Sequence, residues 1–430
     1  MPIAKINPQH APDQAPQHAL VIGGGIVGLS CAIALQRQGI ATTLATRSRM
    51  RGTASWGNAG HIATEQVEPL ASLATVRSMP GRLFCRGGAL ALPPRLIGAW
   101  LPFSLRLLRA TAPATFARGK TALEAALALA MPAWRRLLDT AAAPDLLVEA
   151  GHFIVWETPA SAARGRRHWS RAALGATTSW RDATAGEIAA IQAHVACPVA
   201  GAIRFAGSGQ IADPDALADA LETAFAALGG RYIDAGAQAL RRRPDGTVAV
   251  DLDNGETHSA DAVIVAAGAA SAALLAPLGL RAPMIAERGY HIQADGSGWP
   301  ADMPPVVFED RSMIVTRFRS GLRAASFVEF GTLDAPADPR KWDRLEQHAK
   351  ALGLPMHDPA PWMGARPTLP DYLPAIGKSP AANNLYYAFG HQHLGLTLGP
   401  LTGEAIAAIV ARQPTPIDIA PFSLQRFGNP

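Results

Sequence analysis

The sequence predicts an α/β protein of two domains: a discontinuous, Rossmann-like dinucleotide-binding domain and an α+β domain built on an antiparallel sheet. Its 430 residues are too many for one ordinary core. A strand, a glycine-rich turn and a helix follow one another near the N-terminus, and similar segments recur in the middle and near the C-terminus. The stretches between them are helix-rich or alternate polar and apolar residues, as antiparallel strands do.

The first nucleotide-type segment begins at His18. Residues 19–22 form a short apolar run, and a helical stretch then leads to a second strand at residues 41–45. The turn has the spacing Gly-x-Gly-x-x-Gly, whose glycines allow a tight turn, close approach to a pyrophosphate and close packing of helix on strand. The helix N-terminus favours an anion. We therefore predict a dinucleotide pyrophosphate site formed by Gly23, Gly25, Ile26, Val27 and Gly28.

Two later segments complete the predicted domain. A buried strand within residues 260–271 ends at Ala267 and Gly268, and a strand near the C-terminus leads through the loop Gly390–Gly399 into a helix. We predict residues 18–64, 196–282 and 363–412 for the dinucleotide-binding domain, 65–195 and 283–362 for the second domain, and 1–17 and 413–430 for tails.

Composition narrows the classes of function. Hydrophobic residues make up 49% and charged residues 17% of the chain, which is typical of a folded globular protein. The formal charge of +5 comes from scattered side chains, which favours an anionic cofactor, an anionic substrate or a membrane surface over nucleic acid. Cys31, Cys85 and Cys197 form no CxxC pair, as expected in a reducing cytosol. The sequence contains no uninterrupted run of about 18 apolar residues, so no membrane-spanning helix is predicted.

The end of the second strand leaves the identity of the dinucleotide open. A ribose-binding acid is expected there, but the position is near Thr46 and is followed by Arg47 and two further arginines, which favour NADP. The later segments favour FAD, since the helix after the glycine loop could stabilise negative charge on a reduced flavin. The other predicted cofactor contacts are Ala267 and Gly268 in the middle segment and Gly390, Leu394, Gly395, Leu396 and Thr397 in the last.

Motifs along most of the chain carry a resemblance to a known family. They are GGGIVG (23–28), ASWGNAG (54–60), DPDAL (213–217), VIVAAGAAS (263–271), ERGYHI (287–292), GARPTLPDYLPAIG (364–377) and YAFGHQHLGLTLGP (387–400). From His18 to about Val410 the chain resembles the D-amino-acid oxidase-like flavoenzymes, most closely their bacterial D-amino-acid dehydrogenase branch. The resemblance implies FAD as the cofactor.

The resemblance also implies which residues surround the flavin. Along the pyrophosphate and the flavin it places Ser55, Asn58, Ala59 and Gly60. In some relatives a histidine two residues after the serine is covalently linked to the flavin. Gly57 occupies that place here, which implies non-covalent FAD. His61 is expected to pack at the flavin edge.

Three further residues are candidates for contact with the substrate. Arg366 matches the arginine that holds the substrate carboxylate in this family, although it could instead pair with an acid near Asp371. His393 stands where one relative carries a second arginine. Tyr290 is either a pocket residue or an ordinary core tyrosine. His391 and His393 form an HxH pair with no acidic or cysteine partner nearby in the sequence, so no metal site is predicted.

The resemblance implies the oxidation of small D-amino acids, with D-proline or hydroxy-D-proline preferred, by hydride transfer from Cα to the flavin. That branch passes electrons to a quinone. The apolar and basic residues of 82–109 suit a membrane surface, although a buried helical pair would show the same pattern. We therefore expect a cytoplasmic protein that associates peripherally with the inner face of the plasma membrane. The alternatives are a sarcosine- or glycine-type amine oxidase that uses oxygen, and an NADP-linked dehydrogenase.

Overall fold

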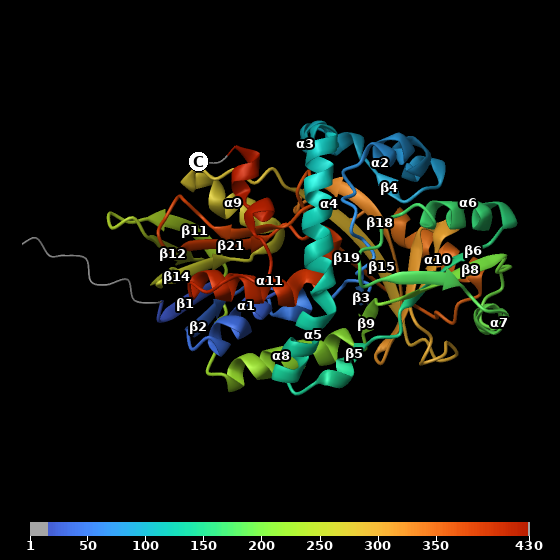
Figure 1. Cartoon of the computed structure of the whole chain (residues 1–430), viewed down its shortest axis with the longest axis horizontal. Coiled ribbons are helices and arrows are strands. Elements are labelled where there is room, and N and C mark those ends of the chain that lie inside the picture. Colours follow the sequence, from blue (N-terminus) through green and yellow to red (C-terminus); the bar gives the residue numbers. More distant parts are fainter. Residues whose placement is uncertain (1–15, 429–430) are drawn as a thin grey trace, which may run out of the picture.

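The computed structural model describes residues 16–428 and shows two large sheets side by side, with the long helix α4 (Pro113–Ala128) between them in the view of Figure 1. The predicted N-terminal tail lies almost wholly outside the described residues. The first sheet confirms the predicted Rossmann-like arrangement: its order is β10-β2-β1-β14-β21-β20, with β20 antiparallel to its neighbour and the other strands parallel. Its strands are β1 (His18–Ile22), β2 (Ala41–Ala45), β10 (Arg231–Ile233), β14 (Ala262–Val265), β20 (Ala375–Lys378) and β21 (Leu385–Phe389).

Strand β1 is buried on both faces because its apolar side chains alternate between two cores. Ala19 and Val21 pack with helices α1 and α11 on one face. Leu20 and Ile22 pack on the other face, against a small antiparallel sheet. Burial on both faces explains the continuous apolar run in the sequence. These elements are α1 (Ile26–Arg37), α11 (Gly395–Val410), β11 (Ala237–Arg242), β12 (Val248–Leu252) and β13 (Thr257–Ser259).

Helices α1 and α11 lie against each other on this sheet (Figure 1). Their contact is close because it is made at glycines: a Cβ at Gly399 would lie 3.1 Å from Ile26, and one at Gly403 would clash with the backbone of Ser30. Within the described residues, the helical stretch Gln392–Val410 is long and apolar enough to cross a membrane, but 78% of its most apolar part is buried inside the protein. Its burial is that of a core helix.

The second sheet is largely antiparallel, as predicted for its central strands. Its order is β19-β15-β18-β17-β16-β6-β8-β7, with β4 paired to β18, and only the β16–β6 and β18–β4 pairs are parallel. Its strands are β4 (Leu90–Ala91), β6 (His152–Trp156), β7 (Ser179–Asp182), β8 (Gly201–Ala206), β15 (Ile285–Ala294), β16 (Val306–Phe308), β17 (Met313–Phe318), β18 (Gly321–Gly331) and β19 (Ala360–Thr368).

Strand pairing changes the predicted division of the chain. Strand β8 falls within 196–282, the range predicted for the dinucleotide-binding domain, but it pairs with β6 and β7 in the second sheet. Strand β19 likewise carries the second sheet past residue 363 to Thr368. The chain thus passes between domains at the ends of strands, and composition does not mark those places.

The predicted C-terminal tail is also part of the fold. Phe422 and Leu424 are each 1% exposed. Arg426 Nε donates to Asp371 Oδ2 at 2.6 Å, which fixes the segment to the loop before β20. The predicted boundary at residue 412 was therefore too early: helix α11 ends at Val410, but the chain beyond it continues along the domain surface and stays packed.

Candidate active site

The predicted cofactor positions gather at one edge of the first sheet, because they follow the carboxyl ends of its parallel strands. Gly23 follows β1, Thr46 follows β2, Gly268 comes shortly after β14, and Gly390 follows β21. Ligands of open α/β sheets bind outside this edge.

The glycine turn is shaped for the close approach of an anion. Gly23 has a φ of +116°, and a Cβ there would clash with Ala266 O. In the described structure, helix α1 begins after Gly25 with no side-chain cap and no acidic residue in its first turn, which contains Val27 and Gly28. The positive end of its dipole is therefore not neutralised by its own segment, and its backbone suits a pyrophosphate.

The loop of residues 53–60 lies directly beside this turn. Ser55 Oγ accepts a hydrogen bond from Ile26 N at 3.0 Å, so the Ile26 amide, predicted to contact the cofactor, is already occupied. Asn58 donates to Ser55 O, and Asn58 Oδ1 accepts from Gly60 N at 2.5 Å. The loop is thus folded on itself and anchored to the start of α1.

Side chains of the second sheet hold the same loop from the other side. Arg323 Nη1 donates to Trp56 O at 2.8 Å and to Asn58 O at 2.5 Å, while Thr316 Oγ1 donates to Ala59 O at 2.8 Å. Arg323 is 1% exposed, and burial lowers its pKa to about 10. Arg323 therefore keeps its positive charge at neutral pH. Because both domains contact the 53–60 loop, the loop joins them.

Position 57, where some relatives carry a flavin-linked histidine, has no room for a side chain. A Cβ at Gly57 would clash with the indole of Trp362. Trp362 stacks on His291, with ring centroids 4.9 Å apart and 13° between the planes, and His291 Nδ1 lies 2.8 Å from Gly57 O. Glycine at this position is therefore required by the packing of the second sheet on the loop.

The arginines after the second strand are paired with carboxylates of their own domain. Arg47 binds Asp253, Arg49 binds Asp234, and Arg51 binds Asp215. Thr46 Oγ1 accepts from Gly24 N at 3.1 Å and donates to Ser48 O at 2.7 Å. The side chains of Thr46 and Arg47, which were predicted to contact the cofactor, are thus already engaged by other residues of their own domain. The same pairing explains the arginines without a 2′-phosphate, which removes the evidence for NADP.

The N-terminus of α11 points toward this region as well. It too has no side-chain cap and no acid in its first turn within the described chain. Leu394 and Leu396 are buried, so only their backbone is available. Thr397 Oγ1 accepts from Ala63 N at 3.0 Å and so connects α11 to the strand after Gly60. The helix is placed to stabilise negative charge at the domain interface.

Arg366 is anchored by a buried acid that the sequence did not single out. Its Nη1 donates to Glu287 Oε1 at 3.3 Å and to Phe327 O at 3.2 Å. Glu287 also accepts from Thr368 Oγ1 at 3.1 Å and from Tyr372 OH at 3.2 Å. The Glu287 side chain is 2% exposed and that of Arg366 28%. Asp371, the acid first considered for Arg366, pairs with Arg426 instead.

The guanidinium of Arg366 covers Gly289, where a Cβ would clash with it. Because Glu287, Gly289 and His291 alternate along β15, they share one face of the sheet with Arg366 and Trp362, their partners on β19. This is the face that holds the 53–60 loop through His291.

His393 lies close enough to Arg366 for the arginine's charge to act on it. Its Nε2 contacts Gln66 Oε1. Burial, together with the nearby positive charge of Arg366, lowers the pKa of His393 to about 3, so the imidazole is neutral at physiological pH. It can offer a hydrogen bond but not a second positive charge. His391 is engaged elsewhere, with Nε2 2.9 Å from Thr402 Oγ1.

Tyr290 is not brought to this site, which corrects its prediction as a substrate contact. It lies between Gly289 and His291 in the sequence and so points to the opposite face of β15. Its hydroxyl donates to Glu329 Oε1 at 3.2 Å and accepts from Asp338 N at 3.2 Å. Glu329 also binds Arg288 and Lys341 in this buried network. Tyr290 is a core tyrosine.

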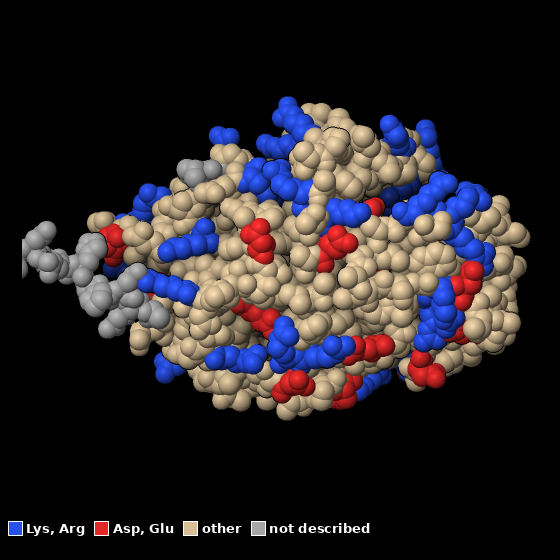
Figure 2. Space-filling model, viewed as in Figure 1, with Lys and Arg blue, Asp and Glu red and all other residues tan. Residues whose placement is uncertain are grey.

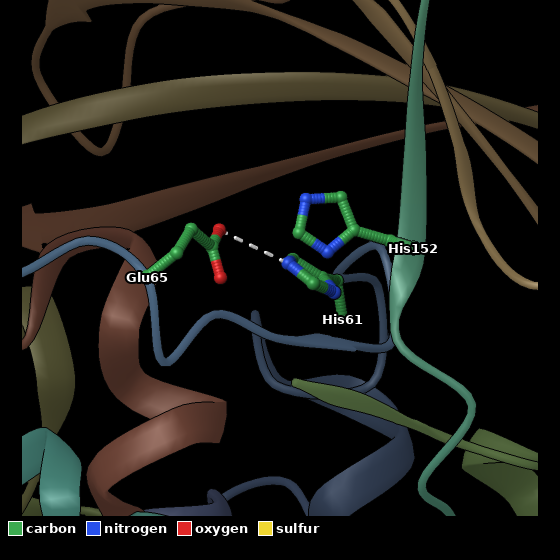
Figure 3. Close-up of side chains that lie close together, drawn as sticks. All are labelled: His61, Glu65 and His152. Atoms are coloured by element: carbon green, nitrogen blue, oxygen red, sulfur yellow. Dashed lines mark hydrogen bonds and ion pairs between the residues drawn. The ribbon is translucent and has the colours of Figure 1, made fainter. Parts of the chain in front are cut away.

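A second group of titratable side chains lies beside His393. His61 on β3 (His61–Ile62), Glu65 in the following loop and His152 at the start of β6 converge, as Figure 3 shows. His61 Nε2 is 3.2 Å from Glu65 Oε1. The sequence suggested only His61, at the flavin edge, because Glu65 and His152 carry no motif and meet it through the fold.

The two sheets are joined through an anchored loop, with a glycine-lined edge on the first and a fixed arginine on the second. Together these features define a two-domain, dinucleotide-dependent oxidoreductase. The chain matches the family described as FAD dependent oxidoreductase over residues 18–409 and belongs to this family. FAD is therefore its cofactor, and the uncapped helices and glycine cradle fit its pyrophosphate and flavin.

Individual relatives agree with this assignment. The chain is 31% identical over 422 residues to a D-amino-acid oxidase of Bradyrhizobium diazoefficiens, covering 96% of this chain and 99% of that protein. It is 31% identical to a D-amino acid dehydrogenase 2 of Ralstonia nicotianae, with 94% and 99% covered. Among solved structures, glycine oxidase from Geobacillus kaustophilus superposes with a TM-score of 0.70 at 26% identity, covering 96% of this chain and 98% of that one.

Proposed function

We propose that this protein oxidises the Cα–N bond of a small D-amino acid, with Arg366 binding the substrate carboxylate. The setting of Arg366 carries the proposal: it is fixed on one side by the buried Glu287 and is 28% exposed on a sheet face that meets the FAD domain. A planar guanidinium held in this way can grip a carboxylate through two hydrogen bonds and so fix Cα. Relatives named D-amino-acid oxidase and D-amino acid dehydrogenase support this substrate class.

Each residue then has a separate task. Bound FAD supplies the acceptor for the hydride that leaves Cα. Arg366 holds the carboxylate, and Glu287 positions Arg366. Neutral His393 lies near the arginine and can orient the substrate through a hydrogen bond without adding charge. The N-terminus of α11 stabilises negative charge that develops across the interface.

The substrate that suits this site best is a small monocarboxylate, because His393 beside Arg366 is neutral and adds no second positive charge. We propose a cyclic D-amino acid such as D-proline or hydroxy-D-proline. A glycine- or sarcosine-type oxidase is the second candidate, favoured by the similarity to glycine oxidase. Anaerobic mixing of the purified protein with D-proline, other D- and L-amino acids, glycine and sarcosine tests both. Bleaching of the flavin by D-amino acids is expected; bleaching by glycine and sarcosine alone supports the second candidate, and none at all contradicts both.

We also propose that FAD is bound without a covalent link. The packing of Gly57 against Trp362 supports this, since a linking side chain at that position would clash. Denaturation should release all of the flavin into the supernatant. Flavin that stays on the denatured chain would contradict the proposal.

The electron acceptor is proposed to be a membrane quinone, reached by docking of helix α3 (Ile97–Ala110) on the lipid surface. The helix is 14 residues long and exposes an apolar stripe of Ile97, Leu101, Leu105 and Leu108, which are 43–54% exposed. Its other side packs through Phe103 and Leu107 against Phe330. Helix α3 lies at the upper edge of the molecule in Figure 1, beside α2 (Leu73–Ser78).

Charge supports the same surface. Residues 69–123 contain no aspartate or glutamate, and Figure 2 shows basic side chains along the same upper edge. Apolar side chains flanked by arginines favour an anionic bilayer. The arginines of this segment up to the end of α3 are Arg77, Arg82, Arg86, Arg95, Arg106 and Arg109.

Vesicle flotation tests this surface. The protein should float with phosphatidylglycerol vesicles and less with phosphatidylcholine vesicles, and the double variant Leu101→Glu, Leu105→Glu should lose binding while still reducing a soluble dye. The matched control is Leu228→Glu, since Leu228 is 42% exposed at the end of α8 (Pro214–Ala227). Equal flotation of the double variant and the control would contradict the docking surface. Consumption of oxygen in place of quinone would point to the oxidase alternative.

A further inference from the structure

The group formed by His61, Glu65 and His152 has no task in the proposed oxidation. His61 Nε2 and Glu65 Oε1 are 3.2 Å apart, and the side chains of these two residues are 10% and 4% exposed. His61 Nδ1 and Glu65 Oε2 are buried with no hydrogen-bond partner among residues 16–428. A buried polar atom without a partner is costly, and such atoms are often found where a ligand or a reaction supplies the partner.

The protonation of the group follows from its contacts. Burial opposes ionisation of Glu65, but the neighbouring imidazoles of His61 and His152 outweigh it and lower its pKa to about 2. An ionised carboxylate only accepts hydrogen bonds, so His61 Nε2 must be the donor in their contact. In the tautomer that donates from Nε2, the imidazole of His61 has its lone pair on Nδ1, the atom without a partner.

His152 differs from His61 in this respect. Its Nδ1 lies 2.8 Å from Ser208 Oγ, and its ring stacks on Phe205 at 4.4 Å. Burial lowers the pKa of His152 to about 3, so it stays neutral beside the pair. His152 therefore supports the pair through packing. Within residues 16–428, His61 has a fully buried nitrogen without a hydrogen-bond partner.

The pair lies at the candidate active site. His61 directly follows Gly60, and the next residue after Glu65, Gln66, contacts His393. The charges of Arg366 and Glu65 act on the pKa of His393, so both groups lie close to it. The groups around His61 are thus Glu65 on its own segment, His152 on β6, His393 before α11 with Arg366 beyond it, and the neutral Gln210, its partner on β9 (Gly209–Ile211).

We propose that His61 and Glu65 form a base dyad that deprotonates the substrate ammonium before oxidation. The inference rests on the proposed function. One N–H bond of the ammonium breaks, its electron pair stays on nitrogen as the lone pair, and the proton moves to His61 Nδ1. Glu65 stabilises the imidazolium and fixes the tautomer, as a carboxylate does for the histidine of a catalytic triad. The neutral amine then loses its Cα hydride in the oxidation already described.

Anaerobic stopped-flow measurement of flavin reduction tests the dyad, with the second-order rate constant followed from pH 6 to 9.5. The wild type should show little dependence on the ionisation of the substrate amine. In His61→Gln only the amine that is already neutral reacts, so the constant should rise about tenfold per pH unit. Near pH 7 the variant should be slower by on the order of 10²-fold and should approach the wild type at high pH.

Three further variants separate a base from a structural role. Glu65→Gln should acquire the same slope, because its amide donates to Nε2 and leaves the proton on Nδ1. His61→Ala should recover with added imidazole. His258→Gln, at a partly exposed histidine on β13, is the control and should keep the flat profile.

The outcomes distinguish this inference from the function on which it rests. A wild-type flavin that no amino acid reduces would overturn both. Reduction with parallel pH profiles in the wild type and His61→Gln would overturn the dyad alone. Stoichiometric zinc in the purified wild type that is lost in His152→Gln would assign the group to metal binding and also overturn it.

Discussion

The carboxyl edge of the first sheet and the facing surface of the second sheet make their contacts by different means. The edge presents backbone: Gly23 and Gly25 lie within one turn, and in the described chain α1 and α11 begin without a side-chain cap from their own N-cap residues. The facing surface presents side chains, such as Arg366 and Arg323, which long-range partners hold in place. A backbone cradle needs correct geometry, whereas a side-chain surface needs correct charge. Cofactor binding and substrate chemistry should therefore respond to different substitutions.

The largest difference between the effect on catalysis and the effect on FAD binding is expected for Arg366→Leu. Loss of the carboxylate anchor leaves Glu287 buried without its cation, and truncating one partner of a buried charged pair costs about 2–5 kcal/mol. The value of kcat/KM for the best D-amino acid should fall accordingly, while the FAD content of the purified protein stays at that of the wild type. Steady-state kinetics and flavin absorbance measure the two effects. Unchanged kinetics would remove Arg366 from its assigned role.

A smaller effect is expected for Glu287→Gln, which keeps the shape of the acid and removes its charge. The charge-assisted contact with Arg366 is lost, at a cost of about 1.5–3 kcal/mol. KM should rise, because Arg366 is no longer held for the carboxylate. Asp371→Asn is the matched control: it weakens the pair with Arg426 and should leave KM unchanged. A KM that rises equally in both variants would contradict the positioning role of Glu287.

The difference between a backbone site and a side-chain site also explains which features could be predicted from the sequence. The glycine turn was found because its residues are consecutive and its spacing reports backbone geometry. The anchor of Arg366 was missed because Glu287 is 79 residues away and meets it only through the β15–β19 register. Its signal was the alternation of Glu287, Gly289 and His291 within ERGYHI, which separates them from Tyr290. Local motifs therefore identified the cofactor site, and only strand pairing could identify the partners of the substrate site.

Acid should affect the protein through its buried histidines. Burial lowers the pKa of His391 to about 3 from the usual 6.5, so the folded state holds the imidazole neutral. As the pH falls below about 6.5 the unfolded chain binds the proton first, and stability is lost progressively toward pH 3. At pH 5 this single group costs about 2 kcal/mol relative to pH 7.5. Denaturant unfolding at both pH values should show a smaller loss in His391→Gln. An identical loss would contradict the neutral, buried state of His391.

The smallest effect is expected for Arg47→Ala, and its smallness is informative. The Arg47 side chain is 67% exposed and already paired with Asp253, and exposed pairs contribute little. If the edge binds FAD through backbone alone, the dissociation constant for FAD should change by less than about twofold, because no side-chain charge at this position contributes. Reconstitution of the apoprotein followed by flavin fluorescence measures it. Gly23→Ala is the opposing control, since it forces a Cβ into Ala266 O at a φ of +116° and should abolish reconstitution. A large effect of Arg47→Ala would mean that a side chain at the edge, and not backbone alone, holds the cofactor.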